Sequence, residues 1–355
     1  EVDGTYAIIV DATGSTYAVA AGDVGKFLKV EATGTGAYTG TVTSDPVGPV
    51  AAQTITIAAI PGVTVPEQGE APMDTITDTA QYTGTVTWDP DDTEFEYYTV
   101  YTATITLTPK AGYTLTGVAA DFFTVAGSTT DTNPADSGVV TAVFPRTEAE
   151  PLTGVTIEGT VEYGQTLTAV VAPTGAAADY QWLISTDDVT YDVISGATNS
   201  TYAVAAGDVG SYLKVEATGT GAYTGTVTSD PTGAVAPRPI TVEADPQTKV
   251  YGESDPALTY QVTGDPPLAG DEFTGDLERD AGEDVGDYAI TQGTLTLGSS
   301  YAITFVSVDL TITQKAASVT PDAGQGKVYG ETDPGLTGVL AGFLVADDVT
   351  AEFSR

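Results

Sequence analysis

The densest group of carboxylates lies in residues 89–96, where five Asp and Glu side chains occur within eight positions. Calcium binding needs several oxygen ligands that converge on one point, so this run is the first candidate for a cation site. A calcium-binding loop, however, requires Asp and Gly where Thr93 and Glu94 stand. Two sparser groups, Asp187-Asp188 and residues 265–271, match that pattern no better. We therefore expect solvated acidic loops without metal ligands, and a bound Ca²⁺ remains the alternative.

The residue types exclude most enzyme chemistry. The 355 residues include no His and no Cys, so Ser-His and Cys-His nucleophiles, thiolate metal sites and disulfides cannot be built. A carboxylate pair could still hydrolyse a glycoside, but 49 acidic residues make such pairs by chance and none stands out. We expect no catalytic residues, no cofactor-binding residues and no enzymatic activity.

The charge balance excludes two classes of partner. The 49 acidic residues face only 11 Lys and Arg, which gives a net charge of −38. Such a field repels phosphate backbones, since nucleic-acid binding requires a cationic patch that releases counterions. No apolar run approaches the roughly 20 residues of a membrane helix. Nucleic acid and membrane insertion are therefore not expected, and any export signal or anchor is expected outside this segment.

Aromatic side chains are the remaining candidates for ligand contact, because they can stack on sugar rings. Trp182 is expected in the core, and so is Trp88, which ends an alternating strand. The pair Tyr97-Tyr98 must turn one ring outward if it lies in a strand. That ring is the best candidate for a glycan contact.

The only two Asn residues are candidates for covalent modification. An intramolecular Lys–Asn isopeptide bond could join Asn133 to Lys110 or Asn199 to Lys214. Asn199 also begins a three-residue glycosylation sequon. We expect both patterns to arise by chance.

Two internal repeats organise the chain, as in tandem arrays. Residues 15–50 and 200–235 differ at four of 36 aligned positions, at an offset of 185 residues. A run that begins Lys249-Val-Tyr-Gly returns at Lys327, at an offset of 78 residues. Short stretches rich in Pro and Ala separate the repeats, and such connections restrict the swing of adjacent modules.

The hydrophobic pattern predicts strands throughout. Residues 101–108 alternate strictly between Thr and larger apolar or small side chains, a period of two that is typical of a half-buried strand. No window shows a sustained helical period with caps. The 40 Gly and 20 Pro supply turns. An all-β fold of antiparallel sandwiches is therefore predicted.

Three segments place an aromatic residue four positions after an Asp. They are Asp23/Phe27, Asp208/Tyr212 and Asp284/Tyr288. The spacing matches the tyrosine corner of immunoglobulin-like folds, in which the hydroxyl bonds to upstream backbone. Phe27 lacks that hydroxyl. Trp182 precedes Tyr212 by about thirty residues, where such a sandwich places its buried Trp.

These motifs carry a resemblance to bacterial surface repeats. Residues 152–235, with Tyr180-Gln-Trp182, resemble the immunoglobulin-like repeats of large Gram-positive surface proteins. Residues 239–314, which open with Ile240-Thr-Val and contain Lys249-Val-Tyr-Gly, look like the MBG repeats of exported bacterial adhesins. Residues 54–145 are similar to a Thr-rich repeat found in such chains. The resemblance implies architecture and does not transfer a binding site.

Together the repeats predict five modules in an elongated array of immunoglobulin-like antiparallel β-sandwiches. They are the C-terminal part of an immunoglobulin-like module in residues 1–50, a Thr-rich sandwich in 54–145, an immunoglobulin-like module in 152–235, an MBG-type module in 237–314 and the start of a second MBG-type module in 315–355. The two end modules are expected to be incomplete.

The expected function is that of a structural stalk in an extracellular protein of the bacterial cell surface. Its partners would be neighbouring modules of the same chain. Two alternatives stay open: direct adhesion through host or environmental glycan or mucin, and self-assembly into an extracellular filament.

Overall fold

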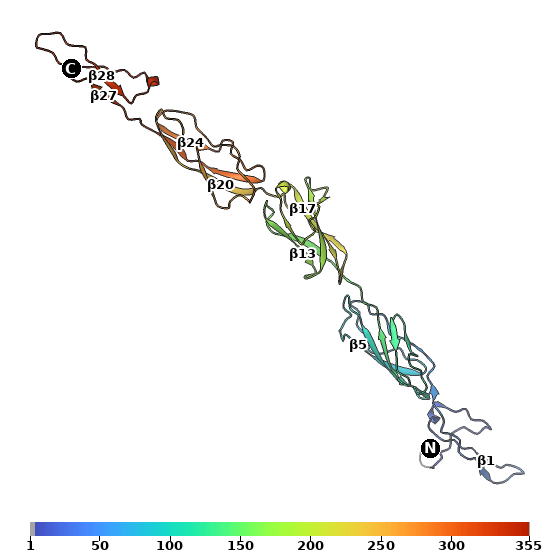
Figure 1. Cartoon of the computed structure of the whole chain (residues 1–355). Helices are drawn as coiled ribbons and strands as arrows, with labels where there is room; N and C mark the ends of the chain where they lie inside the picture. Colours follow the sequence, from blue (N-terminus) through green and yellow to red (C-terminus); the bar gives the residue numbers. More distant parts are fainter. Residues whose placement is uncertain (1–3, 355) are drawn as a thin grey trace. The chain divides into compact units, whose positions relative to one another are not determined.

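The computed structural model describes residues 4–354, which form β-strands joined by turns and three short 3-10 turns (Figure 1). No α-helix occurs in this range, so the predicted all-β fold is confirmed. The chain divides into two units, which are described separately. One contains the residues up to Pro151 with Gly219–Gly225, and the other contains Leu152–Thr218 and the residues from Thr226 onward.

The first unit contains a small hairpin and a well-packed β-domain. The hairpin pairs β1 (Glu31–Thr33) with β2 (Thr41–Thr43) and follows the 3-10 turn η1 (Ala21–Asp23). The strands of the domain are β3 (Gln53–Thr54), β4 (Ala59–Ile60), β5 (Tyr82–Asp89), β6 (Thr102–Pro109), β7 (Tyr113–Thr114), β8 (Thr124–Val125), β9 (Thr130–Thr132) and β10 (Val139–Val143). Its main sheet has the order β5-β6-β10-β9.

The alternation predicted for residues 101–108 is confirmed. Tyr101, Ala103 and Ile105 are each 0% exposed, whereas the Thr side chains between them point away from the core. They belong to one continuous hydrophobic core that runs from Ile55 to Phe144. The apolar face of β6 thus anchors this domain, because buried apolar area is its main source of stability.

The second unit begins with two sheets. One joins β12 (Gly154–Glu158), β13 (Thr166–Ala172) and β16 (Thr201–Ala203), and the other has the order β15-β14-β17-β19. The strands of the second sheet are β14 (Ala178–Ser185), β15 (Asp192–Val193), β17 (Tyr212–Gly219) and β19 (Thr226–Thr228). Strand β18 (Tyr223–Thr224) lies in the first unit, where it pairs with β11 (Glu150–Pro151).

Residues 238–313 form two further sheets, of order β22-β20-β25 and β21-β26-β24-β23. Their strands are β20 (Arg238–Ala244), β21 (Gln247–Val250), β22 (Tyr260–Thr263), β23 (Glu278–Arg279), β24 (Gly286–Thr291), β25 (Tyr301–Val306) and β26 (Asp309–Thr313). The core contains Ala244, Ile290, Leu310 and Ile312. After it come β27 (Ser318–Pro321), β28 (Gly338–Ala341) and the turn η3 (Val345–Asp347).

Most strand pairs are antiparallel, as predicted, but some are not. Among residues 4–354, five strand pairs are parallel: β3–β7, β4–β8, β11–β18, β20–β25 and β21–β26. Parallel partners are joined by long connections. Local alternation shows which side chains of a strand are buried but carries no information about such distant partners.

The predicted tyrosine corner is found once. The hydroxyl of Tyr288 donates a 2.9 Å hydrogen bond to the backbone oxygen of Asp284, four residues upstream. Tyr212 makes no such bond within residues 4–354. In the repeated segments the buried Asp23 and Asp208 instead accept hydrogen bonds from Tyr17 and Tyr202.

Candidate functional site

The acidic run 89–96 is organised by hydrogen bonds to the core. Asp92 Oδ2 accepts a 2.6 Å bond from the hydroxyl of buried Tyr101, and that hydroxyl oxygen accepts the backbone N–H of Glu96 at 2.8 Å. Phe95, between Glu94 and Glu96 of the run, is 2% exposed. Throughout the described residues, no three acidic side chains converge as a metal site requires. The bonds to Tyr101 therefore account for the arrangement of the carboxylates in this loop.

The second acidic group forms a tight turn. Asp187 Oδ1 accepts the backbone N–H groups of Val189 at 2.9 Å and of Thr190 at 3.0 Å. These bonds, that of Thr190 first, lower the pKa of the Asp187 carboxyl. Asp188 has a positive φ of 57° and accepts a hydrogen bond from the Tyr191 hydroxyl. The pair thus stabilises its own turn.

The carboxylates of residues 265–271 do not converge either. The Asp265 side chain is 81% exposed and reaches Arg238 at 3.3 Å. Asp271 instead accepts two phenol hydroxyls, from Tyr163 at 2.9 Å and from Tyr301 at 2.6 Å.

Both Trp side chains are core residues, as predicted. Trp88 is 8% exposed, packs against Phe95 and Phe144, and donates its indole N–H to the Met73 oxygen at 2.8 Å. Trp182 is 0% exposed and donates to the Asn199 oxygen at 3.0 Å. Neither ring is available to stack on a sugar.

The pair Tyr97-Tyr98 lies in a turn rather than a strand. Tyr98 has a positive φ of 49° and is 38% exposed. The guanidinium carbon of Arg146 lies 4.2 Å from the centre of its ring. A cation therefore already covers one face of the ring that was the best candidate for a glycan contact.

The side chains considered for isopeptide bonds have other partners. The amide of Asn133, a residue 2% exposed, donates to the oxygens of Ala119 and Pro134 and accepts the Phe123 N–H. Lys110 Nζ donates to the Thr79 oxygen at 2.6 Å.

In the second pair, Lys214 Nζ lies 4.3 Å from the centre of the Tyr191 ring. Both lysines thus lie against partners other than the two Asn side chains.

A charge cluster in residues 249–283 was missed by the sequence analysis. Lys249 Nζ lies 2.6 Å from Asp255 Oδ1, and Arg279 bridges Asp255 at 2.7 Å and Glu283 at 2.6 Å. Arg279 first, then Lys249, lowers the pKa of Asp255 to about 2. Two cations balance two anions, so the cluster holds loops together and offers no unpaired base or acid. The recurrence of Lys249 and Asp255 at Lys327 and Asp333 was the available signal.

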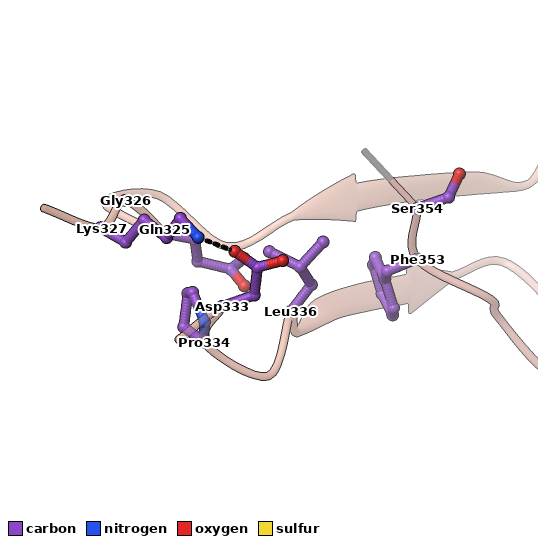
Figure 2. Close-up of a pocket in the computed structure, with 8 residues that line it drawn as sticks. All are labelled: Gln325, Gly326, Lys327, Asp333, Pro334, Leu336, Phe353 and Ser354. Carbon is purple, nitrogen blue, oxygen red and sulfur yellow. Dashed lines mark ion pairs between the residues drawn. The ribbon is translucent and has the colours of Figure 1, made fainter. Parts of the chain in front are cut away.

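A cavity of about 590 Å³ lies in the last segment (Figure 2). Lys327 and Asp333 form an ion pair beside it, and Leu336 and Phe353 line it. The residue that aligns with Leu336 is Leu258, which packs against Ile290, Leu310 and Ile312 in the preceding domain. One of the residues that line the cavity thus aligns with a residue packed on the core of the preceding domain.

Residues 240–311 match the family model described as MBG domain (YGX type). The match covers strands β20 to most of β26, which include the charge cluster and the core around Ile290. No curated protein matches the chain. The match supports the resemblance to MBG repeats seen in the sequence of this part of the chain, which is called the MBG domain below. Across the described residues no helix is long and apolar enough to cross a membrane.

Proposed function

We propose that the chain is a structural spacer in a bacterial surface adhesin-like repeat protein. The MBG match supports the class of protein, and MBG repeats are typical of extracellular proteins at the bacterial surface. The candidate side chains described above are engaged in core packing, turns or ion pairs. A non-catalytic, mechanical role accounts for this use of the acidic and aromatic residues.

The observation that carries the proposal is the bonding of the linker at residues 236–238. The Ala236 N–H donates to the Val161 oxygen at 2.9 Å, and the Ala236 oxygen accepts the Tyr163 N–H at 3.0 Å. Two residues later, the Arg238 N–H donates to the Ser300 oxygen at 2.9 Å. The linker is thus bonded to the preceding and the following segment, which limits its freedom.

Small-angle X-ray scattering of the full chain tests the proposal. A compact globule of 355 residues would have a radius of gyration of about 20 Å. Modules arranged end to end over about 150 Å would give a value of about 43 Å. We expect the larger value at physiological salt. A value near that of a globule would reject the spacer.

The two alternatives give different results in parallel measurements on the same chain. Specific, saturable binding on a glycan array would favour direct adhesion. An apparent molar mass from light scattering that rises with protein concentration would favour filament assembly. A stalk predicts no binding on the glycan array and the mass of a monomer at every concentration.

A further inference from the structure

Within the second unit, a Tyr-Gly pair of one segment lies against a turn of the next. The Tyr163 hydroxyl donates a 2.9 Å hydrogen bond to Asp271, which is 108 residues away in the sequence. The Tyr163 ring also meets the Tyr301 ring edge to face, with centroids 5.5 Å apart. The contact therefore combines a charge-assisted hydrogen bond with an aromatic pair.

Residues of the receiving domain hold Asp271 in place. The Tyr301 hydroxyl donates to the same carboxylate oxygen at 2.6 Å and accepts the Leu268 N–H at 2.8 Å. The Asp271 N–H in turn donates to the Leu268 oxygen at 3.0 Å, which closes a Leu-x-x-Asp turn. The carboxylate is thus oriented before Tyr163 binds to it.

Gly164 allows the side chain of Leu268 to approach the backbone closely. Gly164 has a positive φ of 81°, and a Cβ on it would lie only 2.5 Å from Leu268 Cδ1. Leu268 therefore rests directly on the Gly164 backbone. A side chain at this position would have to displace the leucine and would strain the turn.

The same arrangement recurs at the next boundary, between different residues. The Tyr251 hydroxyl donates to Asp347 Oδ1 at 2.7 Å, and a Cβ on Gly252 would lie 2.3 Å from Leu344 Cδ1. The Asp347 N–H donates to the Leu344 oxygen at 3.1 Å, as in the first turn. Two boundaries with different flanking sequences thus share one set of contacts.

In each of these two pairs, the tyrosine also bonds to the last residues of its own segment, just before the next segment begins. The Tyr163 N–H donates to the Ala236 oxygen, and the Tyr251 N–H donates to the Thr313 oxygen. A third pair, Tyr329-Gly330, has no such turn over it in the described chain, and Tyr329 is fully exposed. Tyr163 and Tyr251 are thus partly buried where a turn covers them, and Tyr329 is exposed where none does.

We propose that each Tyr-Gly pair is a docking element that fixes the orientation of the following domain by binding its Leu-x-x-Asp turn. The element occurs twice: Tyr163-Gly164 binds Leu268 and Asp271, and Tyr251-Gly252 binds Leu344 and Asp347. The inference deepens the proposed spacer function and rests on it. It identifies the contacts that make the spacer stiff.

Electrostatics explains why a specific contact is needed. Residues 152–235 contain nine acidic side chains and one Lys, and residues 237–314 contain fourteen acidic and three basic side chains. Like charges of this size repel when the segments approach. A neutral phenol donor can dock on a carboxylate without adding to that repulsion.

Pulsed electron spin resonance on the full chain tests the docking. The chain contains no Cys, so Val170→Cys and Val306→Cys, at positions 41% and 40% exposed, place two spin labels without further changes. We expect a narrow distance distribution for this parent. Tyr163→Phe should lower the ratio of docked to undocked populations about fivefold, which corresponds to about 1 kcal/mol. Tyr163→Ala should make the broad, undocked distribution dominant.

Two controls make the result specific. Tyr191→Phe removes a Tyr–Asp hydrogen bond within residues 152–235, and Tyr251→Ala removes the element at the other boundary. Both should leave the 170–306 distribution narrow. Circular dichroism and hydrogen exchange confirm that each variant is folded.

A parent distribution that is already broad would overturn the docking inference. So would a Tyr163→Ala variant as narrow as the parent. Neither result bears on the spacer itself, because the radius of gyration of the parent decides that separately. A small radius of gyration together with a narrow 170–306 distance distribution would reject the proposed spacer but still support the docking contact.

Discussion

The hydroxyl of Tyr202 donates a 2.7 Å hydrogen bond to Asp208 Oδ2, and Asp208 is only 7% exposed. The same oxygen accepts the Ala205 N–H at 2.8 Å. Burial, and then the bond to Asp208, raises the pKa of the Tyr202 hydroxyl. Tyr17 and Asp23 form the same bond at 2.7 Å in the other copy of the repeat. The pair thus ties a strand to the 3-10 turn that follows it.

Replacing Tyr202 by Phe should destabilise residues 152–235. The change leaves the buried Asp208 carboxylate without one of its donors, which costs about 1–3 kcal/mol. Hydrogen exchange of the strands around Trp182 should accelerate accordingly. Tyr191→Phe, which loses a more exposed bond to Asp188, should have a smaller effect. Equal effects of the two changes would contradict the role assigned to Asp208.

Replacing Asn133 by Ala should destabilise the domain around β6. The buried Phe123 N–H loses its acceptor, and the Ala119 oxygen, at an exposed position, loses a donor. An unsatisfied buried group costs about 1–3 kcal/mol, so a loss of that size is expected in denaturant unfolding. Asn199→Ala, at an exposed position, is the matched control and should change the unfolding free energy little. An Asn133→Ala variant as stable as the parent would contradict this prediction.

Intact mass spectrometry should give the full mass of the sequence, without the loss of ammonia that accompanies each Lys–Asn isopeptide bond. The physical reason is that Lys110 and Asn133 bind different partners. Peptide maps of the parent and of Lys110→Ala should therefore both lack a cross-linked peptide. A cross-linked peptide that contains both residues would refute the prediction.

The charge cluster should make the MBG domain sensitive to acid. Arg279 and then Lys249 hold the pKa of Asp255 at about 2 in the folded state, below the ordinary value of 3.8. A depressed carboxyl pKa stabilises the fold above about pH 4, and this contribution is lost as the pH falls toward 2. Lys249 and Arg279 lower the pKa of Glu283 as well, with the same sign.

Pepsin digestion between pH 4 and 2, read by mass spectrometry, measures this effect. Cleavage within residues 237–314 should rise as the pH falls, and Asp255→Asn should be cleaved faster at pH 4 with a weaker pH dependence. Asp265→Asn, whose side chain is 81% exposed, corrects for the pH dependence of the protease. Identical profiles for the two variants would contradict the assignment.

The sequence predicted those features that depend on local pattern. The alternation at residues 101–108, the burial of Trp88 and Trp182 and the bond of Tyr288 to Asp284 were all correct. Each follows from spacing within a few residues or from the size of an apolar side chain. The MBG domain was found because its motifs are long and repeated.

What could not be predicted depends on residues far apart in the sequence. The pairing of Tyr163 with Asp271 spans 108 residues, and the parallel partners of β20 and β21 lie 63 residues away, as from Arg238 to Tyr301 and from Gln247 to Leu310. The ion pairs of Arg279 depend on how two loops meet. Tyr97-Tyr98 was considered as part of a strand because the positive φ of Tyr98 leaves no mark on hydrophobicity.

The parallel pairing of β21 with β26 determines how the MBG domain bears tension. The chain enters through β20 and β21 and leaves through β26, so pulling on the two ends slides β21 and β26 past each other along their length. The register from Gln247↔Leu310 to Val250↔Thr313 is then loaded in shear, with all its hydrogen bonds sharing the force. An antiparallel hairpin pulled from its open end would instead unzip one bond at a time.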